Sequence, residues 1–396
     1  MVYSTHPQTM EPDSMGRHQA GVVLCLLASL ACSTVLSAQA KSRIRPRRAN
    51  TYYVAADTVT WDFTPSGSNQ ITGQPFDPVE RPFVEAGKWH IGHVALKAIY
   101  REYTDSTFAT LKPRPPESRY LGILGPLLRA EVGDTIRVVF RNNLDAPATM
   151  HPHGVFYTKE SEGAPYAGGP GERDLEGNAV PPGHTHVYVW PVPERAGPAS
   201  GDGKSILWMY HSHIHEEEDL STGLLGPIIV SARGTTRADG TPNDVDREVV
   251  LAFDEIDEDA SRYLKTNLHR YASQGDSAPI VFAFGVASAG GPAESQDNFK
   301  ETVNGYMYGN GPMPAMKVGE RVRWYLMAST GFEIHSPHWH GNTVQVAHMR
   351  TDVAMLLPMG MVVADMVPDN PGIWLVHCHV SSHLRMGMQA RYVVTK

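Results

Sequence analysis

The chain has 396 residues and a formal net charge of −8, with 41% hydrophobic and 19% charged residues. This length suits two domains of moderate size, and the negative charge argues against a nucleic-acid or anionic-membrane partner. The 36 glycines and 30 prolines favour a turn-rich β protein over a helical one.

The N-terminus has the pattern of a secretory signal peptide over residues 1–40. An apolar stretch at 21–36 is followed by a small-residue cleavage pattern, AQA, at 38–40. The stretch is too short for a good membrane span, although an uncleaved anchor is the alternative. We therefore expect a secreted or periplasmic protein with no membrane partner after cleavage, which begins with a basic tail at 41–50.

Cleavage would leave one cysteine in the mature chain. Cys25 and Cys32 lie inside the signal segment, so only Cys378 remains. An exported protein with one cysteine has no internal disulfide. A lone thiol in an oxidising compartment needs protection or a chemical role.

Short β-prone runs with Gly/Pro turns follow along the rest of the chain, for example at 52–56, 135–140, 187–190 and 373–376. This pattern is typical of β-sandwiches. A polar segment at 234–246 reads as a linker. We expect one domain at 51–233 and a second at 247–396.

The two predicted domains repeat each other. The run MHPHG at 150–154 matches PHWHG at 337–341, and YHSH at 210–213 matches VHCH at 376–379. In each half an HxHG motif precedes a second HxH motif, which indicates an internal duplication.

Each HxH motif can act as a two-imidazole clamp, because residues i and i+2 of a strand point to the same face. Imidazole suits copper, zinc and iron. Four such pairs at matching positions predict that several metal ions are held where the two domains meet. The eight histidines are His151, His153, His211, His213, His338, His340, His377 and His379.

Strand parity predicts a second, different metal environment. Cys378 lies between His377 and His379 and should point to the opposite face. His335 is offset by an odd number from His338, so it should also face away from the clamp, and the following loop adds His383 and Met388. Two imidazoles, a thiolate and a weak thioether make a blue-copper electron-transfer site.

These motifs resemble the multicopper oxidase family. HSPHWHG at 335–341 and HCHVSSHLRMGM at 377–388 are similar to its signatures. The sequences of 120–127, 151–166 and 209–230 are similar to those of ceruloplasmin-like members. The resemblance implies an all-β fold of two cupredoxin-like Greek-key sandwiches. It also implies a copper-dependent enzyme with dioxygen as the acceptor, and a homotrimer in which each copper cluster is shared between neighbouring chains.

The resemblance also implies a role for each ligand. His335, Cys378 and His383 would hold a type 1 copper with Met388 as the axial ligand, and His151 and His338 a type 2 copper. Electrons would pass from the donor near His383 through Cys378 to His377 or His379. A coupled type 3 pair would be held by His153, His211, His213, His340, His377 and His379.

The first domain departs from this pattern. Ser212 stands where Cys378 stands in the second domain, Ala148 matches His335, and Glu217 falls opposite His383. We therefore expect no blue copper in the first domain. The acidic run at 216–219 is interpreted as a solvated loop rather than a cation site or proton relay.

The electron donor is less well specified than the acceptor. We expect laccase-like oxidation of phenols or aromatic amines, with oxidation of ferrous or cuprous ion as the alternative. Ceruloplasmin-like ferroxidases place a carboxylate just before the blue-copper histidine, where this chain has Ser382. A copper nitrite reductase ranks lower because it would not need eight cluster histidines, and a non-enzymatic relative, like the related domains of clotting factors, would not need a complete ligand set.

Overall fold

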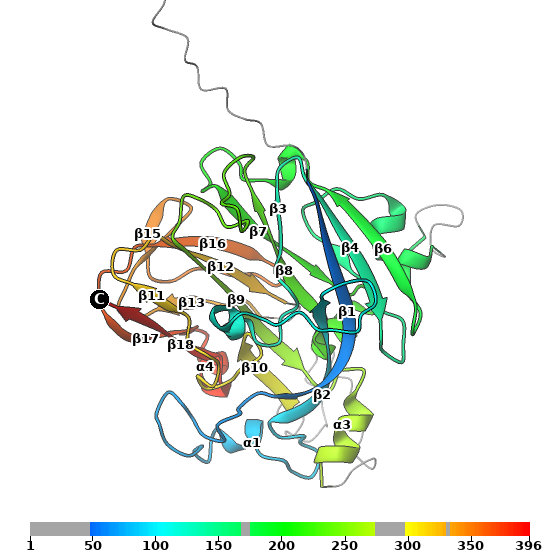
Figure 1. Cartoon of the computed structure of the whole chain (residues 1–396). Helices are drawn as coiled ribbons and strands as arrows, with labels where there is room; N and C mark the ends of the chain where they lie inside the picture. Colours follow the sequence, from blue (N-terminus) through cyan, green and yellow to red (C-terminus); the bar gives the residue numbers. More distant parts are fainter. Residues whose placement is uncertain (1–47, 168–174, 274–297, 330–332) are drawn as a thin grey trace, which may run out of the picture. The chain divides into compact units, whose positions relative to one another are not determined.

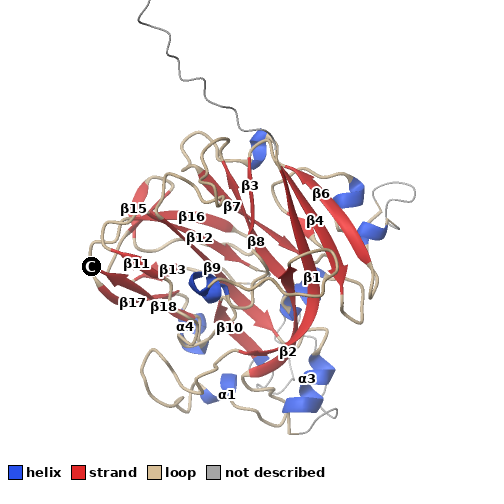
Figure 2. Cartoon of the chain, viewed as in Figure 1, coloured by secondary structure: helices blue, strands red, loops and turns tan. Residues whose placement is uncertain are grey.

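The computed structural model describes residues 48–167, 175–273, 298–329 and 333–396. The predicted signal peptide and most of the basic tail lie outside these ranges. Strands dominate and the helices are short (Figure 2). No helix in these ranges has the length and apolarity needed to cross a membrane.

The first half of the chain forms two four-stranded sheets (Figure 1), in the orders β2-β1-β4-β6 and β3-β8-β7-β5. Their buried faces share one core, which includes Val138, Phe140, Trp190 and Ile228. The strands are β1 (Ala49–Asp62), β2 (Val94–Tyr103), β3 (Leu128–Glu131), β4 (Thr135–Asn142), β5 (His151–Pro152), β6 (Thr185–Pro191), β7 (Ser205–His211) and β8 (Leu225–Ser231).

The second half forms a six-stranded sheet, β10-β9-β12-β16-β14-β15, and a four-stranded sheet, β11-β18-β17-β13. A second core lies between them and includes Trp324, Trp339 and Tyr392. The strands are β9 (Arg247–Asp257), β10 (Phe299–Val303), β11 (Ala315–Lys317), β12 (Val322–Ala328), β13 (Pro337–Trp339), β14 (Val344–Val346), β15 (Met349–Thr351), β16 (Met361–Met366), β17 (Gly372–Cys378) and β18 (Gln389–Thr395).

The two halves share most of their strand connectivity, as the duplicated motifs predicted, and the second half adds β14 and β15. In the first half β1 pairs antiparallel with β2 and parallel with β4, and in the second half β9 pairs in the same way with β10 and β12. Likewise β3 runs parallel to β8, and β11 runs parallel to β18. This places β5 and β7 at positions equivalent to β13 and β17, and these are the strands that carry the HxH motifs.

A third apolar cluster joins the halves. Leu207 and Met209 of β7 pack with Val250 of β9 and with Tyr325 and Met327 of β12. The segment 234–246, which was predicted as a linker, lies between β8 and β9. The helices are α1 (Arg81–Val84), α2 (Glu216–Thr222), α3 (Leu264–Tyr271) and α4 (Ser381–Met386).

Candidate metal centre

The first four histidines converge at one end of β5 and β7. His151 pairs across these strands with His211, and the Nε2 atoms of His153 and His211 lie 3.0 Å apart. The ring of His213 lies 5.1 Å from that of His151 and 5.4 Å from that of His211, measured between centroids. The structure therefore brings all four together.

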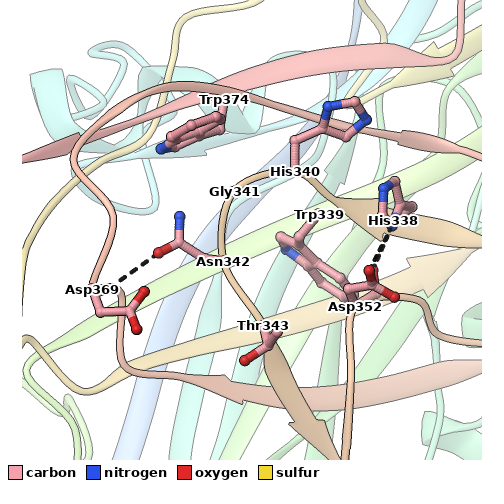
Figure 3. A pocket seen from close by; sticks show the side chains of 9 residues that line it. All are labelled: His338, Trp339, His340, Gly341, Asn342, Thr343, Asp352, Asp369 and Trp374. Carbon is pink, nitrogen blue, oxygen red and sulfur yellow. Dashed lines mark hydrogen bonds and ion pairs between the residues drawn. The ribbon is translucent and has the colours of Figure 1, made fainter.

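The second four histidines converge in the same way on β13 and β17. His338 pairs with His377, and the Nε2 atoms of His340 and His377 lie 3.1 Å apart. The ring of His379 lies 4.7 Å from that of His338. His338 and His340 also line an open pocket of about 420 Å³ together with Asp352 and Trp374 (Figure 3).

In both groups, a backbone carbonyl group orients one histidine ring on each of the two strands. The Nδ1–H of His151 donates to the carbonyl oxygen of Glu162 at 2.6 Å, and that of His338 donates to Asp352 at 2.8 Å. The equivalent bonds from His211 and His377 go to the carbonyl oxygens of the next residues, at 3.0 and 2.8 Å. A ring that donates through Nδ1 leaves Nε2 free to bind a metal ion.

Burial lowers the pKa of several of these rings and so keeps them neutral. Loss of solvent, followed by the neighbouring histidines, lowers the pKa of His153 to about 4 and the pKa of His211 well below its ordinary value. Burial also lowers the pKa of His340 and His377. Neutral imidazole is the form that binds metal ions, so both groups fit a copper site.

The two four-histidine groups do not meet within the described part of the chain. Ring contacts between these histidines occur only among His151, His153, His211 and His213, or only among the four of the second half. Each group therefore offers half of the donors that a shared cluster would need.

A buried group on the other side of β17 contains His335, Cys378 and His383. The two Nδ1 atoms lie 3.2 Å apart, and the Sγ atom lies 3.6 Å from Nδ1 of His383. All three side chains are at most 2% exposed, and Met388 is fully buried beside them. The Cys378 thiol lies on the face opposite His377, in agreement with strand parity.

The donor set of this buried group fits a blue copper. Two imidazole nitrogens and one sulfur lie within 4.8 Å of one another. The amides of Ser336 and Val380 donate to Sγ at 3.3 and 3.4 Å, which stabilises a thiolate. Without a metal ion, burial raises the pKa of the Cys378 thiol.

The corresponding place in the first half has no such donors. The residue equivalent to His383 there is not the one that the sequence comparison of the two halves predicted. The amides of Gly223 and Leu224 donate to the carbonyl oxygen of Asp219, just as those of Gly387 and Met388 donate to that of His383. Asp219, rather than Glu217, is therefore equivalent to His383. The loop between His213 and this turn is two residues longer than its counterpart, so counting from the HxH motif gave the wrong residue.

The prediction of a solvated acidic loop at 216–219 is also wrong. These residues form the first turn of α2. Asp219 is fully buried, and there it pairs with Arg262 and accepts hydrogen bonds from Ser212 and Ile214. Glu216 points toward the first histidine group, with its carboxylate oxygens 3.8 Å from His211 Nε2 and 3.6 Å from His213 Nε2.

Three carboxylates surround the edge of His383, and the sequence motifs did not reveal them. Glu333 lies 3.0 Å from Nε2 of the ring, and Glu301 lies 3.9 Å from Nδ1. Glu255 faces Glu301 across the β9–β10 pair. Of the three, only Glu333 had a signal in the sequence. It lies two residues before His335 and therefore has the same strand parity as that candidate ligand.

The two inner carboxylates, Glu255 and Glu301, are not fully satisfied by hydrogen-bond donors in the described part of the chain. One buried oxygen of Glu255 and one of Glu301 have no hydrogen-bond donor among the described residues. Burial, followed by the neighbouring acidic groups, raises the pKa of Glu255 to about 7 and that of Glu301 well above its ordinary value. Such a cluster of buried oxygens would be stabilised by a bound cation.

Comparison with known proteins gives the same family for both halves of the chain. Two family models described as multicopper oxidase match residues 121–235 and 287–396. The chain is 41% identical over 348 residues to Ferroxidase HEPHL1 from Homo sapiens, covering 87% of this chain and 29% of that protein. It is 39% identical to hephaestin and 35% identical to ceruloplasmin, both from Rattus norvegicus, over 87% and 89% of this chain.

The chain spans about a third of the length of these relatives, 29% of hephaestin and 33% of ceruloplasmin. Among solved structures, a multicopper oxidase superposes with a TM-score of 0.54 at 18% identity, covering 88% of this chain and 90% of the other. A copper nitrite reductase from Nitrosomonas europaea superposes with a TM-score of 0.53 at 15% identity, covering 88% and 95%. These likenesses show a fold of cupredoxin-like β-sandwiches.

Proposed function

Because the chain belongs to the multicopper oxidase family, we propose that it oxidises ferrous ion beside His383 and passes the electrons to dioxygen, which is reduced to water. Multicopper oxidases couple dioxygen to a reducing substrate or a metal ion. The observation that carries the choice of donor is the group of carboxylates, Glu255, Glu301 and Glu333, around one imidazole ring. The name of the relative Ferroxidase HEPHL1 supports the same choice.

The acidic group has the properties of a site for a hard cation. Carboxylate oxygens suit hard cations, whereas thioether and thiolate ligands suit cuprous ion. A ferrous ion would bind the carboxylates of Glu255 and Glu301, each of which has one buried oxygen without a hydrogen-bond donor in the described ranges. The Glu333 side chain is 55% exposed, so the site opens to solvent at that residue.

We propose the following copper ligands. His335, Cys378 and His383 hold a type 1 copper with Met388 as the axial ligand, and the two four-histidine groups supply the type 2 copper (His151 and His338) and the type 3 pair. Bound copper would accept single electrons at the first site and deliver them to dioxygen at the others. The remaining type 3 ligands are His153, His211, His213, His340, His377 and His379.

The chain's own residues connect the donor site to the cluster ligands. His383 presents Nε2 to Glu333 and Nδ1 to Cys378, so one ring joins the cation site to the thiolate. The carbonyl oxygen of Cys378 then holds the ring of His377. Burial of these groups excludes water and keeps the imidazoles neutral.

Laccase-like oxidation of phenols has less support than the sequence alone suggested. Ser382 does lack a carboxylate, but Glu333, from a different segment of the chain, supplies one to the His383 imidazole. The likeness to a nitrite reductase extends only to the fold. The eight cluster histidines, grouped four and four, favour an oxidase.

We further propose that the protein is exported and forms a ring of three chains. The two histidine groups stay apart within one chain, so a shared cluster needs the first group of one chain and the second group of its neighbour. A cyclic trimer joins them head to tail and leaves no cluster incomplete.

Oxygen uptake by the copper-loaded protein tests the proposed donor. We expect faster uptake with ferrous ion than with a methoxyphenol, and Glu301→Gln should raise the KM for ferrous ion at least about tenfold while leaving phenol oxidation unchanged. The matched control is Glu320→Gln, whose carboxylate pairs with Arg247 on the surface. Faster uptake with the phenol, or an unchanged KM for ferrous ion in Glu301→Gln, would contradict the proposal.

A further inference from the structure

We propose that the buried ion pair Asp219–Arg262 positions the first histidine group, and so takes the structural role that bound copper has in the second half. Asp219 is thus a positioning residue for His211 and His213. This inference rests on the proposed function, because it assumes that these histidines bind copper.

The hydrogen bonds of the two halves place Asp219 at the blue-copper ligand position. The amide of Ser212 donates to the carbonyl oxygen of Leu224 at 3.2 Å, and that of Cys378 donates to Met388 at 3.1 Å. Together with the turn bonds described above, this makes Asp219, Ser212 and Leu224 equivalent to His383, Cys378 and Met388. A carboxylate therefore stands where the second half has a metal-binding imidazole.

The Asp219 carboxylate holds the loop that carries the histidines. Its Oδ2 atom accepts from the hydroxyl of Ser212 at 2.6 Å and from the amide of Ile214 at 3.0 Å, with the amide of His215 at 3.4 Å. All three donors belong to the run from His211 to His215. In the second half the amide of Val380, equivalent to Ile214, instead donates to the Cys378 sulfur.

The same network extends to the other strand of the group. The Ser212 hydroxyl also accepts from the amide of Thr149 at 3.2 Å, and the Thr149 hydroxyl accepts from the amide of His213 at 3.0 Å. Thr149 lies two residues before His151. The backbone segments that carry His151, His211 and His213 are thus connected through one buried carboxylate.

Arg262 makes this buried carboxylate tolerable. Asp219 is fully buried and the Arg262 side chain is 7% exposed, and the guanidinium donates to Oδ1 of Asp219. A buried carboxylate without a cationic partner would lose its charge or destabilise the fold. Arg262 follows β9 in the sequence, so the second half of the chain supplies the charge that fixes a loop of the first half.

The test is Asp219→Asn in the full-length, copper-loaded protein. We expect the affinity for cluster copper to fall about 10- to 100-fold, seen as loss of the type 2 electron paramagnetic resonance signal and of the type 3 near-ultraviolet band. The blue absorption at Cys378 should be unchanged. A role in overall stability alone would not separate these two signals.

The matched control is Glu248→Gln. Glu248 is another largely buried carboxylate that pairs with an arginine, Arg129, across the two halves, and within the described ranges it contacts Arg129 and Tyr325 rather than a candidate metal-ligand histidine. It should lower the melting temperature and leave cluster copper in place. Ser212→Ala is the milder variant, which removes one donor, keeps the ion pair and should weaken cluster copper less than Asp219→Asn does.

Three results would overturn the inference. The first is that Asp219→Asn retains cluster copper with wild-type affinity. The second is that Glu248→Gln loses as much cluster copper as Asp219→Asn does. The third applies if Asp219→Asn does not fold, and is that Ser212→Ala leaves the affinity for cluster copper unchanged. A wild-type protein that takes up blue copper and no cluster copper would instead contradict the proposed function and remove the basis of this inference with it.

Discussion

Cys378 belongs to both metal environments through different atoms. Its sulfur lies with His335 and His383, while its carbonyl oxygen accepts the Nδ1–H of His377 at 2.8 Å. In the first half Ser212 keeps the carbonyl contact, to His211 at 3.0 Å, but has no thiol. The thiol is thus one of the donors, together with the imidazoles of His335 and His383, that the second half has and the first half lacks.

Glu301 is the residue for which function and stability conflict most directly. Burial and the nearby carboxylates raise its pKa well above the ordinary value of 4.5, so the folded, metal-free state binds more protons than the unfolded chain above that pH. Stability is then lost as the pH rises from 4.5 through the raised pKa. Glu301→Gln should increase the free energy of unfolding of the metal-free protein by about 1–2 kcal/mol at pH 8 and leave it unchanged at pH 4.

Urea denaturation at the two pH values measures this difference. The control Glu320→Gln should change stability in the opposite direction, because the hydrogen bond and charge of Arg247 lower the pKa of Glu320. Its contribution is present at neutral pH and lost as the pH falls. Equal or lower stability of Glu301→Gln at pH 8 would show that the pKa of Glu301 is not raised in the folded protein.

At the scale of the elements, strand parity predicted how the candidate ligands divide between two faces of the strands, and the structure agrees. His338 and His377 lie opposite each other on β13 and β17, and Cys378 points to the other side. Parity is a local property, so it can be read from sequence. Glu255 comes close to His383 only because β9 pairs with β10. Asp219 takes the position equivalent to His383 only because the loop before it is two residues longer. Neither fact can be read from a local sequence pattern.

The structure also explains the glycine of each HxHG motif, which sequence reasoning left without a role. Gly154 and Gly341 have φ values of +75° and +71°, and a Cβ atom on either would lie 2.1 or 2.3 Å from an indole ring. These rings belong to Trp208 of β7 and Trp374 of β17, at equivalent positions in the two halves. The tryptophan thus packs directly against the turn that follows each HxH pair.

Gly341→Ala should therefore be more harmful than an ordinary substitution at a left-handed glycine. Gly319 has a similar φ of +82° but open space around its Cβ position, so Gly319→Ala measures the backbone cost alone, on the order of 1 kcal/mol. We expect Gly341→Ala to cost about 1–3 kcal/mol more in urea denaturation and to reduce copper binding by His340. Equal costs for the two variants would mean that Trp374 moves aside freely.

At the scale of the whole molecule, the separation of the two histidine groups has a functional consequence. If neighbouring chains share each cluster, a chain lacking His153 and a chain lacking His340 carry complementary defects. In mixed rings, the intact second group of one chain would meet the intact first group of another. A cluster within one chain cannot be restored in this way.

Mixing His153→Ala and His340→Ala chains after dissociation should therefore restore activity. Random assembly of equal amounts leaves roughly a quarter of the shared clusters intact. Oxygen uptake by the mixture measures the recovery, and each variant dissociated and reassembled alone is the control. No recovery, together with an active monomer in light scattering, would rule out the shared cluster.

The origin of Arg262 has a consequence for how this duplicated chain can be rearranged. Although the two halves share most of their strand arrangement, the first half obtains the counter-charge for Asp219 from a residue that follows β9 in the second. The halves are thus not interchangeable modules. A chimaera that grafts the first half onto a foreign second half inherits the carboxylate but not its guanidinium, so a recombination point between β8 and β9 must be chosen with Arg262 in view.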